Sequence, residues 1–131
     1  MKHTDRALAS AILLIEDEPS VSAFLQAALE RHGYAVVSAA SGEEGLERLM
    51  DGRFGGVISD IRMPGSVNGA EVHRWIRANR PDLEQRLILI SGDTANSKTQ
   101  ALLEHSGLPF IEKPFRVQSL ISVVESTFGR P

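Results

Sequence analysis

Short runs of apolar residues alternate along this chain with longer stretches in which apolar residues recur every three or four positions. The short runs are rich in branched side chains and bounded by turn residues, a pattern typical of strands buried on both faces of a sheet. The longer stretches have the period of amphipathic helices. The predicted strands are 11–15, 34–38, 56–59, 86–90 and 109–111.

Start and stop signals support a helix after each strand. Pro19 suits a first helical turn and Gly33 a helix end, while Ser41 and Glu44 have the spacing of a capping box. The helix over 95–105 has the thinnest apolar stripe, which favours a mobile element. The other predicted helices are 19–32, 42–51, 69–80 and 117–128.

Strict alternation of strands and helices predicts an α/β fold with a doubly wound parallel sheet and helices on both faces. Five strands in one small unit favour the flavodoxin-like order 2-1-3-4-5. In that order the first and third strands are neighbours, and ligands bind beyond their carboxyl ends. We therefore expect one domain over 11–128, preceded by a flexible leader over 1–10.

Composition narrows the function classes. The chain has 131 residues, 42% hydrophobic, with a net charge of −3 and no block of Lys or Arg, which argues against nucleic-acid binding. There is no cysteine, so thiol chemistry and zinc–thiolate sites are excluded. No apolar stretch approaches the roughly 20 residues needed to span a bilayer, so we expect a cytoplasmic domain without membrane contact.

Polar residues with complementary chemistry follow the predicted strands. Glu16 and Asp17 follow the first strand and Asp60 the third, so the predicted strand order brings three carboxylates together. Oxygen ligands without His or Cys favour Mg²⁺. Ser91 follows the fourth strand and Lys113 the fifth. A divalent cation, a hydroxyl and an ammonium group are what phosphoryl transfer requires.

Four strand-end segments together resemble the receiver domain of two-component response regulators, either stand-alone or part of a hybrid histidine kinase. The likeness covers 11–128. One departure is the loop over 64–69, which is a residue longer than the commonest family form. The segments that carry the resemblance are Leu14-Ile15-Glu16-Asp17-Glu18-Pro19, Asp60-Ile61-Arg62-Met63-Pro64-Gly65, Leu89-Ile90-Ser91-Gly92 and Phe110-Ile111-Glu112-Lys113-Pro114-Phe115.

The resemblance implies a phosphoacceptor signalling domain rather than an enzyme with its own substrate. Asp60 matches the residue that takes a phosphoryl group from a histidine kinase or a histidine phosphotransfer domain. Asp17 resembles the direct Mg²⁺ ligand and Glu16 the acid beside it. The backbone carbonyl of Arg62 would be the third protein oxygen, and Lys113 matches the lysine that pairs with the acceptor.

The resemblance also implies a conformational switch. Ser91 matches the hydroxyl residue that contacts the phosphoryl oxygen, and Phe110 the switch aromatic, here without a hydroxyl group. The output face would combine helix 95–105 with the fifth strand and the last helix, a surface for possible dimerisation. In this family the Lys113–Pro114 bond is expected to be cis.

Two residues just beyond the strand ends predict a rim. Arg62 lies two positions after Asp60, and Asp93 two positions after Ser91. On adjacent loops these side chains can meet across the acyl phosphate. We expect such a pair to restrict the approach of hydrolytic water.

Simpler interpretations of single residues compete with these assignments. Alone, Glu16 would be a solvated acid, Glu18 a solvated acid or a helix cap, and Lys113 a surface lysine. Phe24 and Met50 are expected in the inward apolar stripes of their helices. All four histidines are expected at the surface: His3, His32, His73 and His105.

Two other function classes remain open. A small Mg²⁺-dependent phosphatase of the haloacid-dehalogenase type also uses an Asp nucleophile, but it expects Asp-x-Asp after the first strand, where this chain has Glu16-Asp17-Glu18. A flavodoxin-like binding module, or a receiver that signals without phosphorylation, is the other class. An acidic loop after the first strand repels a flavin phosphate.

Overall fold

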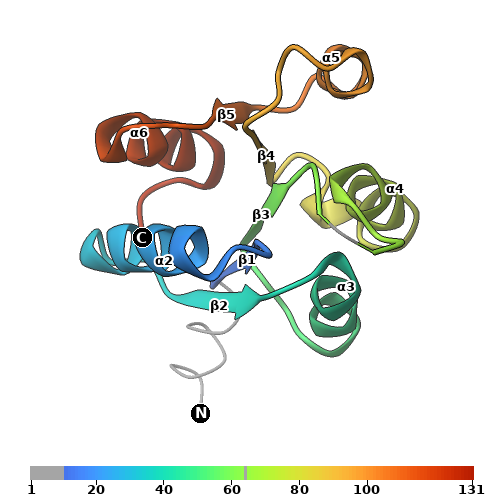
Figure 1. Cartoon of the computed structure of the whole chain (residues 1–131). Helices are drawn as coiled ribbons and strands as arrows, with labels where there is room; N and C mark the ends of the chain where they lie inside the picture. The colour runs from blue at the N-terminus through green and yellow to red at the C-terminus, as the bar shows by residue number, and fades with distance from the viewer. Residues whose placement is uncertain (1–10, 64) are drawn as a thin grey trace.

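A computed structural model describes residues 11–63 and 65–131; the predicted leader, His3 and Pro64 lie outside these ranges. Within them the chain forms a parallel sheet in the order β2-β1-β3-β4-β5, as predicted (Figure 1). The strands are β1 Ile12–Ile15, β2 Val36–Ala39, β3 Gly56–Asp60, β4 Leu87–Ser91 and β5 Phe110–Glu112. The helices are α2 Pro19–Arg31, α3 Gly42–Asp51, α4 Gly69–Asn79, α5 Ser97–Ser106 and α6 Val117–Phe128, with a 3-10 turn at Pro81–Leu83.

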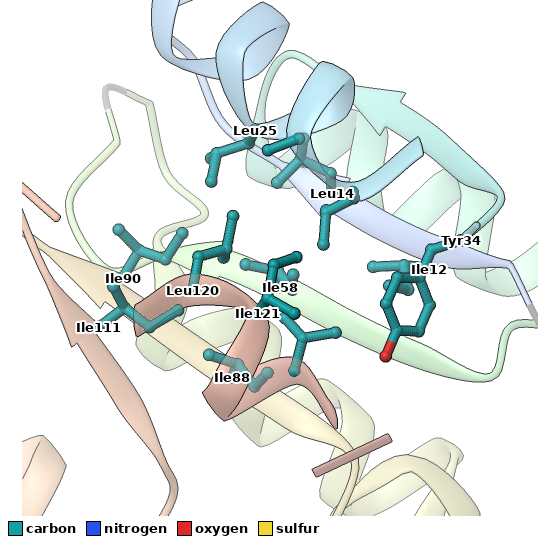
Figure 2. Packing of buried hydrophobic residues seen from close by; sticks show 13 residues of the cluster. Ile12, Leu14, Leu25, Tyr34, Ile58, Ile88, Ile90, Ile111, Leu120 and Ile121 are labelled. Carbon is teal, nitrogen blue, oxygen red and sulfur yellow. The ribbon is translucent and has the colours of Figure 1, made fainter. Parts of the chain in front are cut away.

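Helices cover both faces of the sheet, α2 and α6 on one face and α3, α4 and α5 on the other (Figure 1). Side chains alternate along β1, so that Leu14 packs toward α2 and α6 while Leu13 packs toward α3 and α4. Figure 2 shows the first core, where Leu14 lies among Leu25 from α2 and Leu120 from α6. The strands β1, β3 and β4 are fully buried, as continuous apolar runs predict.

Side chains and backbone geometry fix where the helices begin. The Ser41 hydroxyl accepts from Glu44 N at 3.0 Å, as predicted for a capping box. The return bond differs by one residue, because Glu44 Oε1 accepts from Ala40 N at 2.9 Å rather than from Ser41 N. Glu18 occupies the N-cap position of α2, but its side chain caps nothing, so that prediction is wrong. Pro19, with its fixed backbone angle, instead begins the helix.

Several predicted positions need correction. The second strand begins at Val36 rather than at Tyr34, which instead packs in the core and donates its hydroxyl to Gly129 O at 2.7 Å. Met50 and Phe24 are 63% and 47% exposed, because each lies beside its helix's buried stripe rather than within it. His73 is only 7% exposed and its pKa is lowered, first by burial and then by the charge of Arg77. None of the described helices is long and apolar enough to cross a membrane.

Candidate functional site

Three carboxylates meet at the carboxyl edge of the sheet. Pairing of Ile15 with Ser59 sets β1 and β3 level, so the residues that follow them, Glu16 and Asp60, are neighbours. One oxygen from each of Glu16, Asp17 and Asp60 lies within 4.8 Å of the other two. Glu16 and Asp60 are 2% and 4% exposed, while Asp17 is half-buried. The sequence therefore predicted this convergence correctly, but the solvated state expected of Glu16 alone is wrong.

Lys113 brings a cation to this cluster from β5. Its Nζ lies 2.6 Å from Asp60 Oδ2, 3.1 Å from Glu16 Oε1 and 3.9 Å from Glu18 Oε1. The Lys113–Pro114 bond is cis, as expected. The side chain is 19% exposed, so the surface lysine considered for this position is not what the fold contains.

Burial and charge act against each other in this cluster. Desolvation raises the pKa of Glu16 to about 7, with the charge of Asp60 adding to the rise and Lys113 opposing it. Desolvation acts to lower the pKa of Lys113, but its hydrogen bond to Asp60 and its close ion pairs with Asp60 and Glu16 outweigh this effect and raise that pKa. A neighbouring pair of carboxylates in a poorly hydrated edge is stable only with compensating positive charge.

One buried oxygen without a hydrogen bond, Oε1 of Glu16, indicates that these residues could hold a metal ion. Glu16 Oε1 is fully buried and makes no hydrogen bond; Lys113 Nζ is close enough for an ion pair but lies outside hydrogen-bond geometry. Its other oxygen, Oε2, accepts from Glu18 N at 3.1 Å. An acidic oxygen-only group with an unused buried oxygen could hold a hard metal ion.

Ser91 lies at the adjacent strand end. Asp60 pairs with Ile90 across the two strands, so Ser91 lies one residue further along β4 than the partner of Asp60. Ser91 is 1% exposed. Its Oγ accepts from Asp93 N at 3.1 Å, which holds the start of the loop between β4 and α5. The loop is also tied to β5, since the Thr94 hydroxyl donates to Glu112 Oε2 at 2.6 Å. Sequence reasoning missed this second tie, for which a Thr and a Glu 18 positions apart give no signal.

The predicted rim is present. The Arg62 guanidinium is paired with the Asp93 carboxylate, and the two side chains are 63% and 42% exposed. Arg62 N also donates to Asp60 Oδ1 at 3.1 Å, so the same residue touches the acceptor candidate through its backbone. Both oxygens of Asp60 thus have hydrogen-bond donors, one from Arg62 and one from Lys113.

Gly69 is a further position that sequence reasoning missed. It begins α4, and its N–H donates to Ile61 O at 2.9 Å. A Cβ at this residue would lie 2.7 Å from the backbone oxygen of Asp60, closer than real contacts allow. Only glycine therefore lets α4 begin against the carbonyl of Asp60.

Apolar side chains surround the approach to Lys113. A cavity of about 430 Å³ is lined by residues of α2 and of the loop after β5, among them Phe24, Lys113 and Phe115. The rings of Phe24 and Phe115 are 6.0 Å apart. Phe110, the expected switch aromatic, is 44% exposed on β5 and is not a core residue.

Sequences of known proteins match this chain over most of its length. The model of the response regulator receiver domain family matches residues 12–125. The chain is 33% identical over 126 residues to the sensor kinase CckA of Brucella abortus, covering 95% of this chain and 13% of that protein. It is 28% identical over 119 residues to the response regulator ArlR of Staphylococcus saprophyticus, covering 91% of this chain and 52% of that protein.

A solved structure agrees with this likeness. The response regulator protein TrrA of Thermotoga maritima, in complex with Mg(2+)-BeF, is 31% identical with a TM-score of 0.77, covering 90% of this chain and 98% of that one. The curated relatives are longer, since the chain spans about half of ArlR and 13% of CckA. The matched segment contains all the strand-end residues described above, and the chain belongs to the response regulator receiver domain family of two-component systems.

Proposed function

We propose that Asp60 is the phosphoacceptor of this receiver domain. The observation that carries the proposal is the position of Asp60 Oδ2, 2.6 Å from Lys113 Nζ, within a group of three carboxylates. The carboxylate oxygen is the nucleophile in this proposal, and the ammonium group of Lys113 lies beside it as a compensating positive charge. The 4% exposure of Asp60 also removes most of the water that would compete for the phosphoryl group.

The proposed reaction exchanges one bond for another. A carboxylate oxygen of Asp60 forms a bond to phosphorus while the bond from phosphorus to the donor's histidine nitrogen breaks, and the imidazole keeps the electron pair and is protonated. Lys113 neutralises charge on the phosphoryl oxygens, and Ser91 supplies a neutral hydrogen-bond donor from the next strand end. Glu16, Asp17, Asp60 and the backbone carbonyl of Arg62 would hold Mg²⁺, which neutralises phosphoryl charge when bound. In this proposal the domain catalyses only its own phosphorylation and dephosphorylation.

The proposed location of this domain is the cytoplasm, and its proposed partner is a sensor histidine kinase or a histidine phosphotransfer domain. The donor would approach over Phe24 and Phe115, because these apolar side chains border the cavity that leads to Lys113. Exposed apolar surface of this kind, beside a polar reaction centre, suits an apolar helix of the donor domain. The sensor kinase and the response regulator to which the chain is similar both support a role in a longer phosphorelay protein or beside one.

Phosphorylation is proposed to act on the loop after β4. Ser91 would turn toward the phosphoryl oxygens and give up its hydrogen bond from Asp93 N. Phe110 would then move inward from its exposed position on β5. The surface changed by this movement combines α5, β5 and α6, and dimerisation through it is a possible output. Arg62 and Asp93, paired at the rim, would control access of water to the acyl phosphate.

The decisive test uses a small phosphodonor. The protein incubated with acetyl phosphate and Mg²⁺ should gain the mass of one phosphoryl group, and Asp60→Asn should gain none. A matched control, Asp82→Asn, alters an exposed carboxylate that is paired with Arg80 on the 3-10 turn and should label normally. Label that persists in Asp60→Asn would refute the assignment of the acceptor.

The similarity to TrrA supports a second measurement, since that receiver was solved with Mg(2+)-BeF. Beryllofluoride with Mg²⁺ should shift the NMR signals of residues 16–17, 60–62 and 91–94 in this protein. Asp60→Asn should abolish those shifts. Uptake of phosphate esters with continued turnover would instead favour the phosphatase alternative, and a coloured purified protein would favour a flavin carrier.

A further inference from the structure

A second cavity, of about 690 Å³, lies between α4 and α5 and is bordered by the loop that follows β3. Ile61, Met63 and Leu102 supply apolar lining. Asparagine, serine, threonine and cationic side chains supply the rest. This volume lies in the range of small-ligand sites, and the mixture of apolar surface with a few polar groups is typical of them.

Two helix N-termini meet at this cavity. Asn68 caps α4 and Asn96 caps α5, and both residues line the cavity together with Ala70 and Ser97 from the first turns. The N-terminus of a helix carries partial positive charge and has N–H groups without a partner inside the helix. Asn68 Oδ1 already accepts from Glu71 N, and Asn96 Oδ1 accepts from Lys98 N and Thr99 N, so a ligand would meet the N–H groups at the very start of each helix. The positive ends of two helices, each of ten residues or more, therefore act on the same space.

Thr99 gives an independent indication of a ligand. It is the one buried residue of α5, 3% exposed, and it lies one turn before Leu102 on the same side of the helix. Its N–H donates to Asn96 Oδ1, but its hydroxyl makes no hydrogen bond within the described part of the chain. Because Thr99 lines the cavity, its hydroxyl is within reach of a ligand bound there.

We propose that this cavity binds a small organic oxyanion, a phosphonate, phosphate or carboxylate group carried on an apolar body. The Thr99 hydroxyl and the two helix N-termini would contact the oxyanion, and Lys98 would add a cation at the rim. The apolar body would cover Ile61 and Leu102. Arg62 also lines the cavity, but its guanidinium is already paired with Asp93.

The site is distinct from the proposed phosphorylation site in its electrostatics. Without a divalent cation, the group of Glu16, Asp17 and Asp60 repels anions, whereas the lining of the cavity between α4 and α5 contains Arg62 and Lys98 and none of the described carboxylates. The inference does not depend on the proposed phosphoacceptor. Measurements in metal-free buffer separate the two sites.

The test is an NMR titration of the full chain with phenylphosphonate, which carries an oxyanion on an aromatic ring and cannot donate a phosphoryl group. Signals of residues 61–63, 68–70 and 96–102 should shift together to saturation. Thr99→Val, which keeps size and burial, and Lys98→Ala should each weaken binding about fivefold, the scale of one hydrogen bond or exposed charge. Arg74→Ala, an exposed cation on the outer side of α4, is the matched control and should bind normally.

Two further probes define the ligand class. Benzoate tests a carboxylate on the same ring, and whichever binds more tightly identifies the preferred oxyanion. Inorganic phosphate lacks the apolar body and should bind more weakly than phenylphosphonate. The proposal is overturned if phenylphosphonate causes no saturable shift, if shifts centre on residues 16–17, 60 and 113, or if Thr99→Val and Lys98→Ala both bind like the unaltered protein.

Discussion

The two edges of the sheet use charged side chains in opposite ways. At the amino edge, Arg86 donates to the backbone oxygens of Gly55 and Phe128 and lies 5.8 Å from the centre of the Phe128 ring. At the carboxyl edge, Glu16 is buried with an oxygen that no hydrogen bond satisfies. The charge at the amino edge is used to join parts of the fold, whereas the proposed use of the charges at the carboxyl edge is to bind a cation and a phosphoryl group. Stability and reactivity are therefore located at opposite ends of the same strands.

The largest expected effect is on stability at the amino edge. Arg86→Ala leaves two carbonyl oxygens without their donors, and we expect it to lower the free energy of unfolding by about 3 kcal/mol, the upper range for hydrogen bonds to a charged group. Denaturant unfolding measures this change. Phosphorylation of the folded variant by acetyl phosphate should be unaltered, whereas a loss of labelling would show that the two edges are coupled.

A control and a partial variant sharpen this result. Arg74→Ala removes an exposed arginine from a helical ion pair and should change stability by less than about 0.5 kcal/mol. Arg86→Lys keeps the charge but lacks the planar group that reaches two oxygens at once. Its stability should lie between those of the unaltered protein and Arg86→Ala.

The carboxyl edge should show the reverse behaviour, with stability gained when charge is removed. The pKa of Glu16 is raised from 4.5 to about 7, so the folded state binds a proton more tightly than the unfolded state. Its contribution is therefore present at low pH and is lost as the pH rises from about 5 to about 8. The raised pKa of Lys113 has no effect in this window, because that group is protonated in both states below 10.5.

Glu16→Gln isolates this contribution. In metal-free buffer the unaltered protein should lose roughly 2 kcal/mol relative to Glu16→Gln between pH 5 and pH 8. Addition of Mg²⁺ at pH 8 should restore stability to the unaltered protein more than to the variant. Unfolding curves at several pH values give both comparisons. Parallel pH profiles for the two proteins would contradict a raised pKa of Glu16 in the folded state.

A smaller effect is expected where the carboxyl edge meets a partner. Phe24→Ala removes an exposed ring from the border of the cavity beside Lys113 and should slow phosphoryl transfer from a phosphorylated histidine donor about tenfold, as for a strong interface residue. Labelling by acetyl phosphate should not change. Met50→Ala removes an apolar side chain from α3 that is more exposed than Phe24 and is the control. Equal transfer rates for the two variants would exclude Phe24 from the donor surface.

The smallest effect is expected at the rim. An exposed ion pair contributes little to stability, so Arg62→Ala should leave the free energy of unfolding nearly unchanged. It should nevertheless shorten the half-life of the phosphorylated protein about threefold, because the guanidinium no longer screens the acyl phosphate from water. Decay of the labelled protein after removal of the donor measures this half-life. An unchanged or longer half-life would leave Arg62 without a gating role.

The sequence predicted the carboxyl edge better than the amino edge. Strand-end residues such as Asp60 and Lys113 follow apolar runs directly, so the strand order alone brings them together. The contacts of Arg86 with Gly55 and Phe128 join residues 31 and 42 positions apart, and no periodic pattern marks them. His73 was mistaken for a surface residue because a single histidine on a helix gives no indication of which neighbour covers it.

Burial of single charges was equally inaccessible to sequence reasoning. The pattern indicates that Glu16 lies next to Asp60 but not that Glu16 is almost fully covered, since coverage depends on how the loop after β5 and Lys113 lie over it. The same limit applies to Gly69. A glycine before a helix reads as an ordinary start, whereas its necessity comes from the carbonyl of Asp60 lying against it.

The contact at Gly69 places the start of α4 directly against the backbone of Asp60. The helix begins against the backbone of Asp60 and extends about 16 Å, as expected for 11 residues, toward Arg80. There the Arg80 guanidinium donates to Gly52 O at 3.2 Å and Leu49 O at 3.4 Å, which ties the far end to α3. A tilt of α4 at its first turn would therefore also change the contacts of Arg80 with α3. Through one helix, the backbone of Asp60 is connected to the carboxyl end of α3.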